Sequence, residues 1–187
     1  MKAKERGCKV IHIDPRFTRT SAMADLHVGI RSGTDIAFLG GLINYIIAEG
    51  KWFKEYVEHY TNASTIVSEQ FQDTEELDGL FSGFHEESRS YDTMSWAYAG
   101  TEASTQRKGA AARSASEPHS KEGQPGTDYR RNPPHTDPTL QHPRCVFQVL
   151  KKHFARYTPE MVEQFCGVPK ARFLEIADAF TSASGPE

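Results

Sequence analysis

Cysteine is scarce and unclustered in this sequence of 187 residues. The three cysteines, Cys8, Cys145 and Cys166, are widely separated and form no Cys-x-x-Cys pair, so the sequence carries no motif for an iron–sulfur cluster. The eight histidines show no metal-ligand spacing either. We therefore expect buried or partly exposed thiols, structural or solvated histidines, and no metal site.

The sequence also lacks an excess of basic residues, and it lacks a long hydrophobic run. The net charge is −3 and the isoelectric point is near 6.2, which predicts neither a nucleic-acid partner nor a basic membrane-binding surface. No run of about eighteen apolar residues exists for a bilayer span. The apolar stretch near the amino terminus, residues 9–14, is too short for the core of a signal peptide. We expect no direct membrane insertion.

The first feature that is present is a short β-branched run, Val10 to Ile13, of the kind that forms a strand buried in a parallel sheet. Pro15 ends it, because proline has no N–H to donate to a neighbouring strand. Asp14 and Arg16 therefore lie at the carboxyl end of this strand. In open α/β sheets that edge is where ligands bind.

A second strand-like run, residues 26–30, leads through a turn at residues 31–35 into a strongly apolar helix that Gly50 ends. The 3.6-residue period predicts that this helix buries Ile36, Leu39, Ile43, Ile46 and Ile47. Phe38, Leu42 and Tyr45 widen its apolar surface. Gly40 and Gly41 inside it each destabilise a helix by about 1 kcal/mol relative to alanine. We therefore expect another element to pack closely against them.

The two strand ends and the helix start bring together groups that suit a nucleotide. Carboxylates at Asp14 and Asp35 can accept paired hydrogen bonds from a guanine edge or from ribose hydroxyls. Arg16 and Arg19 suit a pyrophosphate, and the free N–H groups after Thr34 favour anions. The alternative is that Asp14 is an ordinary turn residue, with Ser32 and Asp35 forming a helix capping box.

The rest of the chain changes character twice. Residues 67–100 read as an irregular excursion, and residues 101–137 are so poor in large apolar side chains that we expect a disordered linker or insertion. Helical patterns return at 143–157, 159–166 and 169–180, the second with a strong start at Thr158 and Pro159 and a stop at Gly167. The predicted segments are residues 1–66, 67–100, 101–137 and 138–187.

The predicted fold class is α/β: a partial Rossmann-like parallel sheet with flanking helices, followed by a disordered insertion and a helical C-terminal part. Several stretches resemble the molybdopterin oxidoreductase superfamily and, within it, the large catalytic subunit of respiratory formate dehydrogenase. They cover nearly the whole chain except residues 101–136. They include residues 10–25, 31–47, 56–64, 79–83, 91–92, 137–147, 157–162 and 166–167.

The resemblance implies a cofactor site. In that family the corresponding loops hold the guanosine diphosphate end of a molybdopterin guanine dinucleotide, which here implies contacts from Asp14, Pro15, Arg16, Phe17, Thr18, Gly33, Thr34 and Asp35. We expect Asp35 to read the guanine edge and Asp14 to bind the ribose or the guanine. Arg16 would then lie near the phosphates.

The resemblance also implies a parent enzyme that oxidises formate to CO2 and passes electrons to an iron–sulfur and quinone chain. Its iron–sulfur cluster and its selenocysteine or cysteine ligand to molybdenum have no counterpart among these residues, so we expect an inactive fragment without catalytic residues. The implied partners are the remainder of the catalytic subunit, an iron–sulfur subunit and a membrane cytochrome subunit of a periplasmic complex.

Two alternatives stay open. One is another molybdopterin oxidoreductase, such as a nitrate reductase, although residues 140–147 favour the formate enzymes. The other is a non-catalytic nucleotide-binding module. An ordinary dinucleotide dehydrogenase is disfavoured, because the sequence has no Gly-x-Gly-x-x-Gly motif.

Overall fold

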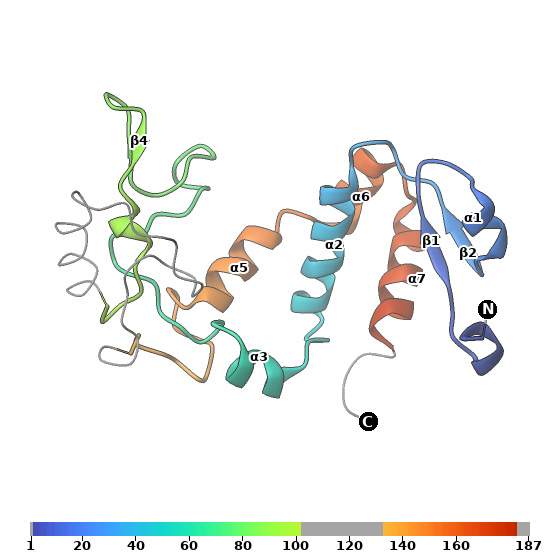
Figure 1. Cartoon of the computed structure of the whole chain (residues 1–187), viewed down its shortest axis with the longest axis horizontal. Helices are drawn as coiled ribbons and strands as arrows, with labels where there is room; N and C mark the ends of the chain where they lie inside the picture. The colour runs from blue at the N-terminus through green and yellow to red at the C-terminus, as the bar shows by residue number, and fades with distance from the viewer. Residues whose placement is uncertain (1, 102–132, 183–187) are drawn as a thin grey trace, which may run out of the picture. The chain divides into compact units, whose positions relative to one another are not determined.

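The computed structural model describes residues 2–101 and 133–182. The chain forms two compact units, one made of residues 1–53 with 151–187 and the other of residues 54–150. Figure 1 shows the elements of both units coloured along the chain. The first unit thus combines residues from both ends of the sequence, and it contains the predicted site.

A two-stranded parallel sheet begins the first unit. Strand β1 (Ile11–Ile13) pairs with β2 (Leu26–Val28), and Ile13 lies opposite Val28. The short helix α1 (Arg19–Met23) connects the strands, and a 3₁₀ helix, η1 (Lys4–Arg6), precedes them. The Asp25 carboxylate accepts a hydrogen bond from the Val10 N–H at 2.8 Å. The predicted parallel strands are therefore confirmed.

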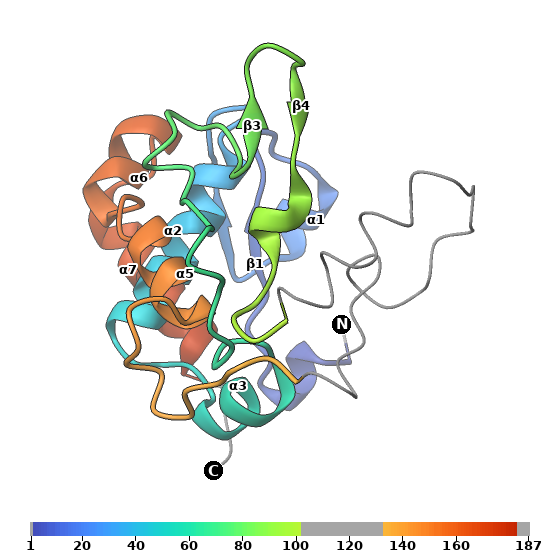
Figure 2. The same ribbon diagram turned by 90° about the vertical axis from the view of Figure 1, so that its left-hand side faces the viewer.

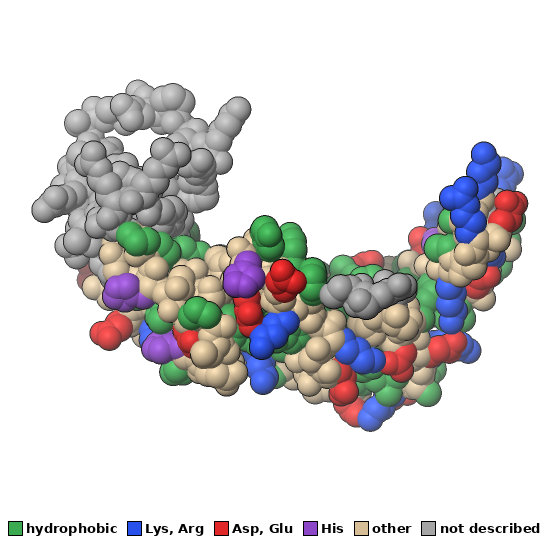
Figure 3. Space-filling view, turned by 90° about the horizontal axis from the view of Figure 1, so that it is seen from below, with side chains coloured by type: hydrophobic (Ala, Val, Ile, Leu, Met, Phe, Trp, Pro, Cys, Tyr) green, Lys and Arg blue, Asp and Glu red, His purple; other side chains and the backbone are tan. Residues whose placement is uncertain are grey.

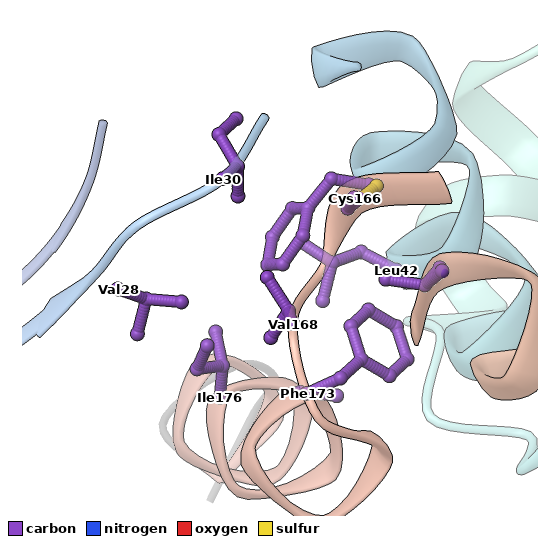
Figure 4. Close-up of a cluster of buried hydrophobic side chains, with 10 residues drawn as sticks. Val28, Ile30, Leu42, Cys166, Val168, Phe173 and Ile176 are labelled. Atoms are coloured by element: carbon purple, nitrogen blue, oxygen red, sulfur yellow. The ribbon is translucent and has the colours of Figure 1, made fainter. Parts of the chain in front are cut away.

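Three helices complete this unit: α2 (Asp35–Ala48), α6 (Pro159–Cys166) and α7 (Lys170–Thr181). They pack against one another, and their buried side chains join those of β2 and the residues after it in one core. Figure 4 shows the strand-side residues Val28 and Ile30 beside side chains of the helical part. The buried core comprises Val28, Ile30, Phe38, Leu42, Val162, Cys166, Val168, Phe173, Ile176 and Ala177.

The predicted signals at the ends of α6 are confirmed. The Thr158 side chain accepts a hydrogen bond from the Met161 N–H at 3.2 Å, which caps the first turn behind Pro159. Gly167 ends the helix in the left-handed conformation, at a φ of 74°. These local signals need no tertiary contact, which is why the sequence alone located both ends.

Gly40 and Gly41 let α2 approach its neighbours closely, as predicted. A Cβ atom built on Gly40 would lie 2.7 Å from the ring of Tyr157, and one built on Gly41 would lie 2.5 Å from Val162 Cγ2. Both distances are shorter than side-chain atoms tolerate. Close packing against Tyr157 and Val162 therefore offsets the poor helix propensity of the two glycines.

The predicted buried face of α2 is partly wrong. The helix buries Phe38 and Leu42, whereas Ile36, Leu39 and Ile43 are 77%, 57% and 38% exposed. Ile46 and Ile47 are half-buried. The helix is apolar on nearly every side, so hydrophobic periodicity favours no face, and the glycine contacts decide which side meets the core.

The second unit has little regular structure. It contains α3 (Lys54–Tyr60), the antiparallel hairpin of β3 (Phe84–His85) and β4 (Ser90–Tyr91), and the 3₁₀ helix η2 (Thr93–Trp96). The hairpin is clear in Figure 2. Helix α5 (Val146–Phe154) begins in this unit and runs past residue 150. Within residues 67–100 the regular elements are thus short.

An extended segment, residues 63–68, holds the second unit together. Its backbone forms hydrogen bonds of 2.7–2.9 Å with residues 97–99, 135–137 and 144–147. The Arg144 guanidinium adds hydrogen bonds to the carbonyls of Ser68 and Phe71. The predicted linker at 101–137 lies mostly outside the described residues, but both of its flanks, Thr101 and residues 133–137, belong to this bonded region.

Asp137 organises the loop that leads to α5. One carboxylate oxygen accepts hydrogen bonds from the Thr139 hydroxyl at 2.6 Å and its N–H at 2.9 Å. The other accepts from the N–H groups of Gln141 at 2.9 Å and His142 at 2.7 Å. The hydrogen bonds, that of the Thr139 side chain foremost, lower the pKa of Asp137 to about 2.

We expect Asp137 to make the free energy of unfolding decrease as the pH falls into the acid range. Its pKa is about 2 when folded and 3.8 ordinarily, so the unfolded state binds the proton first as pH falls. The stabilisation is complete above about pH 4 and is lost as pH falls through 2. Urea unfolding of the wild type and Asp137→Asn between pH 6 and pH 2 should show a stability difference that shrinks on acidification. A difference that is constant over this range would contradict the assignment.

Candidate functional site at the carboxyl edge of the sheet

The two predicted loops leave the same edge of the sheet. Because β1 and β2 are parallel and in register, residues 14–18 and residues 29–35 both start at their carboxyl ends. The Asp14 N–H donates to the Val28 carbonyl at 3.1 Å, which fixes the start of the first loop against the end of β2. In Figure 1 this edge lies where the blue ribbons of β1 and β2 lead toward α1 and α2.

Asp14 is half-buried and holds its own loop in a tight turn. Its Oδ1 accepts a hydrogen bond from the Arg16 N–H at 2.7 Å, an Asx-turn geometry. Its Oδ2 lies 4.0 Å from His12 Nε2, beyond hydrogen-bond distance. Asp14 is thus the turn residue of the alternative interpretation, and Oδ2 retains the capacity to accept a hydrogen bond from a ligand.

The next four residues of this loop are exposed. Pro15, Arg16 and Thr18 face solvent, and the Phe17 side chain is 71% exposed. The Phe17 and His27 rings form a T-shaped pair, with 5.1 Å between ring centroids. Thr18 begins α1. The loop therefore presents one cation and one aromatic face beside the Asp14 carboxylate.

The second loop ends in an uncapped helix start. Gly33 has a φ of 82° with open space around its Cα, which suits the turn into α2. The Thr34 hydroxyl donates to the Arg31 carbonyl at 2.7 Å, and no side chain caps the helix. The capping box of Ser32 and Asp35 does not form. Asp35 is exposed in the first turn, beside N–H groups that favour an anion.

Arg31 anchors the second loop, a role that the sequence did not predict. Its guanidinium donates to the carbonyls of Gln164 at 2.5 Å and Phe165 at 3.1 Å, and its N–H donates to the Cys166 carbonyl at 2.9 Å. Arg31 thus satisfies the carboxyl end of α6, where a cation is also favoured by the helix dipole. Since these partners lie more than 130 residues away in sequence, no local pattern could reveal them.

The structure brings the eight predicted residues to one edge as two short segments. It does so with Asp14 fixed by β2 and with the second loop fixed by α6 through Arg31. That Asp14 and Asp35 contact one ligand stays a prediction. The arrangement supplies acceptors, cations and unpaired N–H groups to a small polar ligand, and the described residues include no cluster of histidine, cysteine or carboxylate side chains suited to a metal ion.

Charged side chains of both signs are interspersed on the face drawn in Figure 3. The described helices include none that is long and apolar enough to cross a bilayer.

Of the three thiols, Cys8 is exposed, while Cys145 and Cys166 are buried without forming a disulfide. The cysteines therefore match the predicted buried or partly exposed thiols.

Comparison with known proteins shows which sequences the chain resembles. No protein-family model matches the chain. It is 40% identical over 187 residues to the formate dehydrogenase subunit alpha of Megalodesulfovibrio gigas, and the match covers 100% of the chain and 15% of that protein. Over its whole length the chain is homologous to a part of formate dehydrogenase alpha subunits. The predicted resemblance to the molybdopterin oxidoreductases is thereby confirmed.

Two further relatives define the scope of this assignment. The nitrate-inducible major subunit of formate dehydrogenase from Escherichia coli strain K12 is 43% identical over 188 residues, covering 100% of the chain and 16% of the relative. The assimilatory nitrate reductase catalytic subunit of Bacillus subtilis is 43% identical over only 77 residues, or 41% of the chain. The chain thus spans about one sixth of the length of the formate dehydrogenase subunits that it matches.

Proposed function

We propose that this chain forms part of a formate dehydrogenase catalytic subunit and binds the guanosine diphosphate end of its molybdopterin guanine dinucleotide. The observation that carries this proposal is the position of residues 14–18 and 33–35 at one carboxyl edge of a parallel strand pair. Ligands of open α/β sheets bind at that edge. The homology of the whole chain to a part of formate dehydrogenase subunits supports the same function.

The groups at this edge fit the nucleotide chemically. Asp14 Oδ2 and the Asp35 carboxylate are acceptors for the N1–H and the exocyclic amine of guanine or for ribose hydroxyls. The exposed Arg16 guanidinium and the uncapped start of α2 suit the phosphates. The exposed Phe17 ring offers an apolar surface next to them. In this proposal the residues of the chain bind and orient the nucleotide.

The proposed parent enzyme oxidises formate to CO2, and the bound molybdenum cofactor supplies the redox chemistry. An iron–sulfur cluster and a quinone chain of that enzyme would accept the electrons. Its partners are the rest of the catalytic subunit and the iron–sulfur and membrane cytochrome subunits of a periplasmic complex. Three apolar side chains of α2 are exposed: Ile36, Leu39 and Ile43. This exposure supports the proposal that α2 packs against another part of the polypeptide in the parent enzyme.

A second candidate is the corresponding part of another molybdopterin oxidoreductase. The match to a nitrate reductase over 41% of the chain supports this candidate, whereas the two formate dehydrogenase subunits match over the whole chain. The nucleotide-binding role is the same in both candidates. The neighbouring genomic sequence distinguishes them, because it shows the residues that would bind the metal.

Isothermal titration calorimetry with GDP tests the binding role. We expect Asp35→Ala and Asp14→Ala each to weaken GDP binding by about tenfold or more, because a hydrogen bond to a charged group contributes about 1.5–3 kcal/mol. Glu49→Ala is the matched control, since Glu49 is an exposed carboxylate just beyond the other end of α2. Equal affinities for wild type, Asp14→Ala and Asp35→Ala would contradict the proposal.

A further inference from the structure

Two histidines lie directly behind the first loop of the candidate site. His12 of β1 and His27 of β2 are paired in the sheet register, and their ring centroids are 5.7 Å apart. The residues next to them in each strand, Ile11 and Ile13 in β1 and Val28 in β2, belong to the core or pack against it. Because successive side chains of a strand alternate between the two faces of the sheet, the two histidines lie on the face opposite these residues. Neither histidine is among the eight proposed nucleotide contacts.

His27 contacts the loop at two points. Its Nε2 lies 3.2 Å from the Asp14 carbonyl oxygen, and because a carbonyl only accepts, Nε2 must carry the hydrogen. The same ring lies nearly perpendicular to the Phe17 ring, with 5.1 Å between the ring centroids. His27 therefore contacts both the backbone of Asp14, through a hydrogen bond, and the side chain of Phe17, through its ring.

His12 reaches the other end of the loop through a buried hydroxyl. The Ser21 side chain accepts the Thr18 N–H at 2.8 Å and lies 2.9 Å from His12 Nδ1. Ser21 is only 5% exposed, so its single hydrogen needs an acceptor, and His12 Nδ1 provides it. His12 then carries its proton on Nε2, which points toward Asp14 Oδ2 at 4.0 Å.

We propose that His12 and His27 are positioning residues that fix the loop from Asp14 to Thr18 in its nucleotide-binding geometry. His27 fixes the first residue of the loop and Phe17, and His12 fixes Thr18 through Ser21. Neither histidine needs to touch the nucleotide. This inference rests on the proposed function, because it assigns the loop a ligand whose affinity depends on the orientation of Asp14 and Phe17.

Paired substitutions separate this role from general support of the fold. His27→Leu removes the N–H donor, whereas His27→Gln retains an N–H near the position of Nε2. His12→Leu removes the acceptor for Ser21, whereas His12→Asn retains an acceptor near Nδ1. His85→Leu, which changes an exposed strand histidine of the second unit, is the control.

Calorimetry with GDP on the 187-residue chain gives the first measurement. We expect the two leucine variants at His12 and His27 to bind GDP about tenfold more weakly, and the glutamine and asparagine variants to recover most of the affinity. Leucine variants that fold and bind as tightly as wild type would overturn the inference. A wild-type chain that binds no GDP would instead overturn the proposed function.

Nuclear magnetic resonance of the imidazole nitrogens tests the positioning independently of any ligand and of variants that fail to fold. We expect both His12 and His27 of the wild-type chain to carry hydrogen on Nε2. We also expect the Arg16 and Thr18 amide signals to move in the leucine variants and to return in the glutamine and asparagine variants. Hydrogen on Nδ1 of His27 would overturn the inference.

Discussion

Replacing Phe173 with alanine is expected to lower the free energy of unfolding by about 3–5 kcal/mol. The Phe173 side chain is completely buried in the first unit, and its ring meets that of Phe38 edge to face at 5.5 Å. Its removal would leave a cavity where α2, α6 and α7 pack together. The loss of the contact between the two rings would lower the free energy of unfolding further. Urea unfolding followed by tryptophan fluorescence and circular dichroism measures the change.

Phe165→Ala is the matched control for that experiment. Phe165 lies on α6 of the same unit and is 51% exposed, so its truncation should change the free energy of unfolding by about 0.5 kcal/mol or less. Similar losses for Phe165→Ala and Phe173→Ala would show that the core is not packed as described.

Replacing Gly41 with leucine is expected to destabilise the first unit by about 2 kcal/mol. A leucine would improve helix propensity by about 1 kcal/mol, but its Cβ would start 2.5 Å from Val162 Cγ2 and 3.0 Å from the Phe173 ring. Overpacking of this kind costs about 1–3 kcal/mol and sometimes more. Since Val162 is a stiff β-branched residue at the centre of the core, the neighbours cannot move aside easily.

Gly29→Ala is the control for the glycine experiment. A Cβ atom at Gly29 meets nothing within 4 Å, so thermal unfolding of Gly29→Ala should match that of the wild type. A Gly41→Leu variant as stable as Gly29→Ala would contradict the close approach of α2 to α6. The same result would remove the explanation for the face that α2 buries.

The elements that the sequence predicted well are those with local signals. Pro15 predicted the end of β1, and Thr158, Pro159 and Gly167 predicted both ends of α6. Each of these residues acts through its own backbone angles or a hydrogen bond within one helical turn. Such signals persist whatever the rest of the chain does.

The predictions that failed concern choices made by distant contacts. Ile36, Leu39 and Ile43 were expected in the core because they share a helical face, but α2 is apolar on other faces too. The side that became buried is set by Val162 and Phe173, which come more than a hundred residues later. Periodicity alone could not include those partners.

The candidate site shows the same division. The sequence predicted that residues 14–18 and 33–35 follow neighbouring parallel strands, and the register of β1 and β2 confirms it. It did not predict the anchoring of the second loop by Arg31 or the support of the first by His12 and His27. These contacts depend on the packing of α6 and on the strand register. No local sequence motif predicts either of them.

A titration of the ¹⁵N-labelled chain with GDP, followed by nuclear magnetic resonance, tests the central claim most directly. If one nucleotide binds at the carboxyl edge of the sheet, the amide signals of Arg16 to Thr18 and of Gly33 to Asp35 should shift together, with a single dissociation constant. Shifts confined to one of these loops, or to residues of the second unit, would contradict a site formed by both.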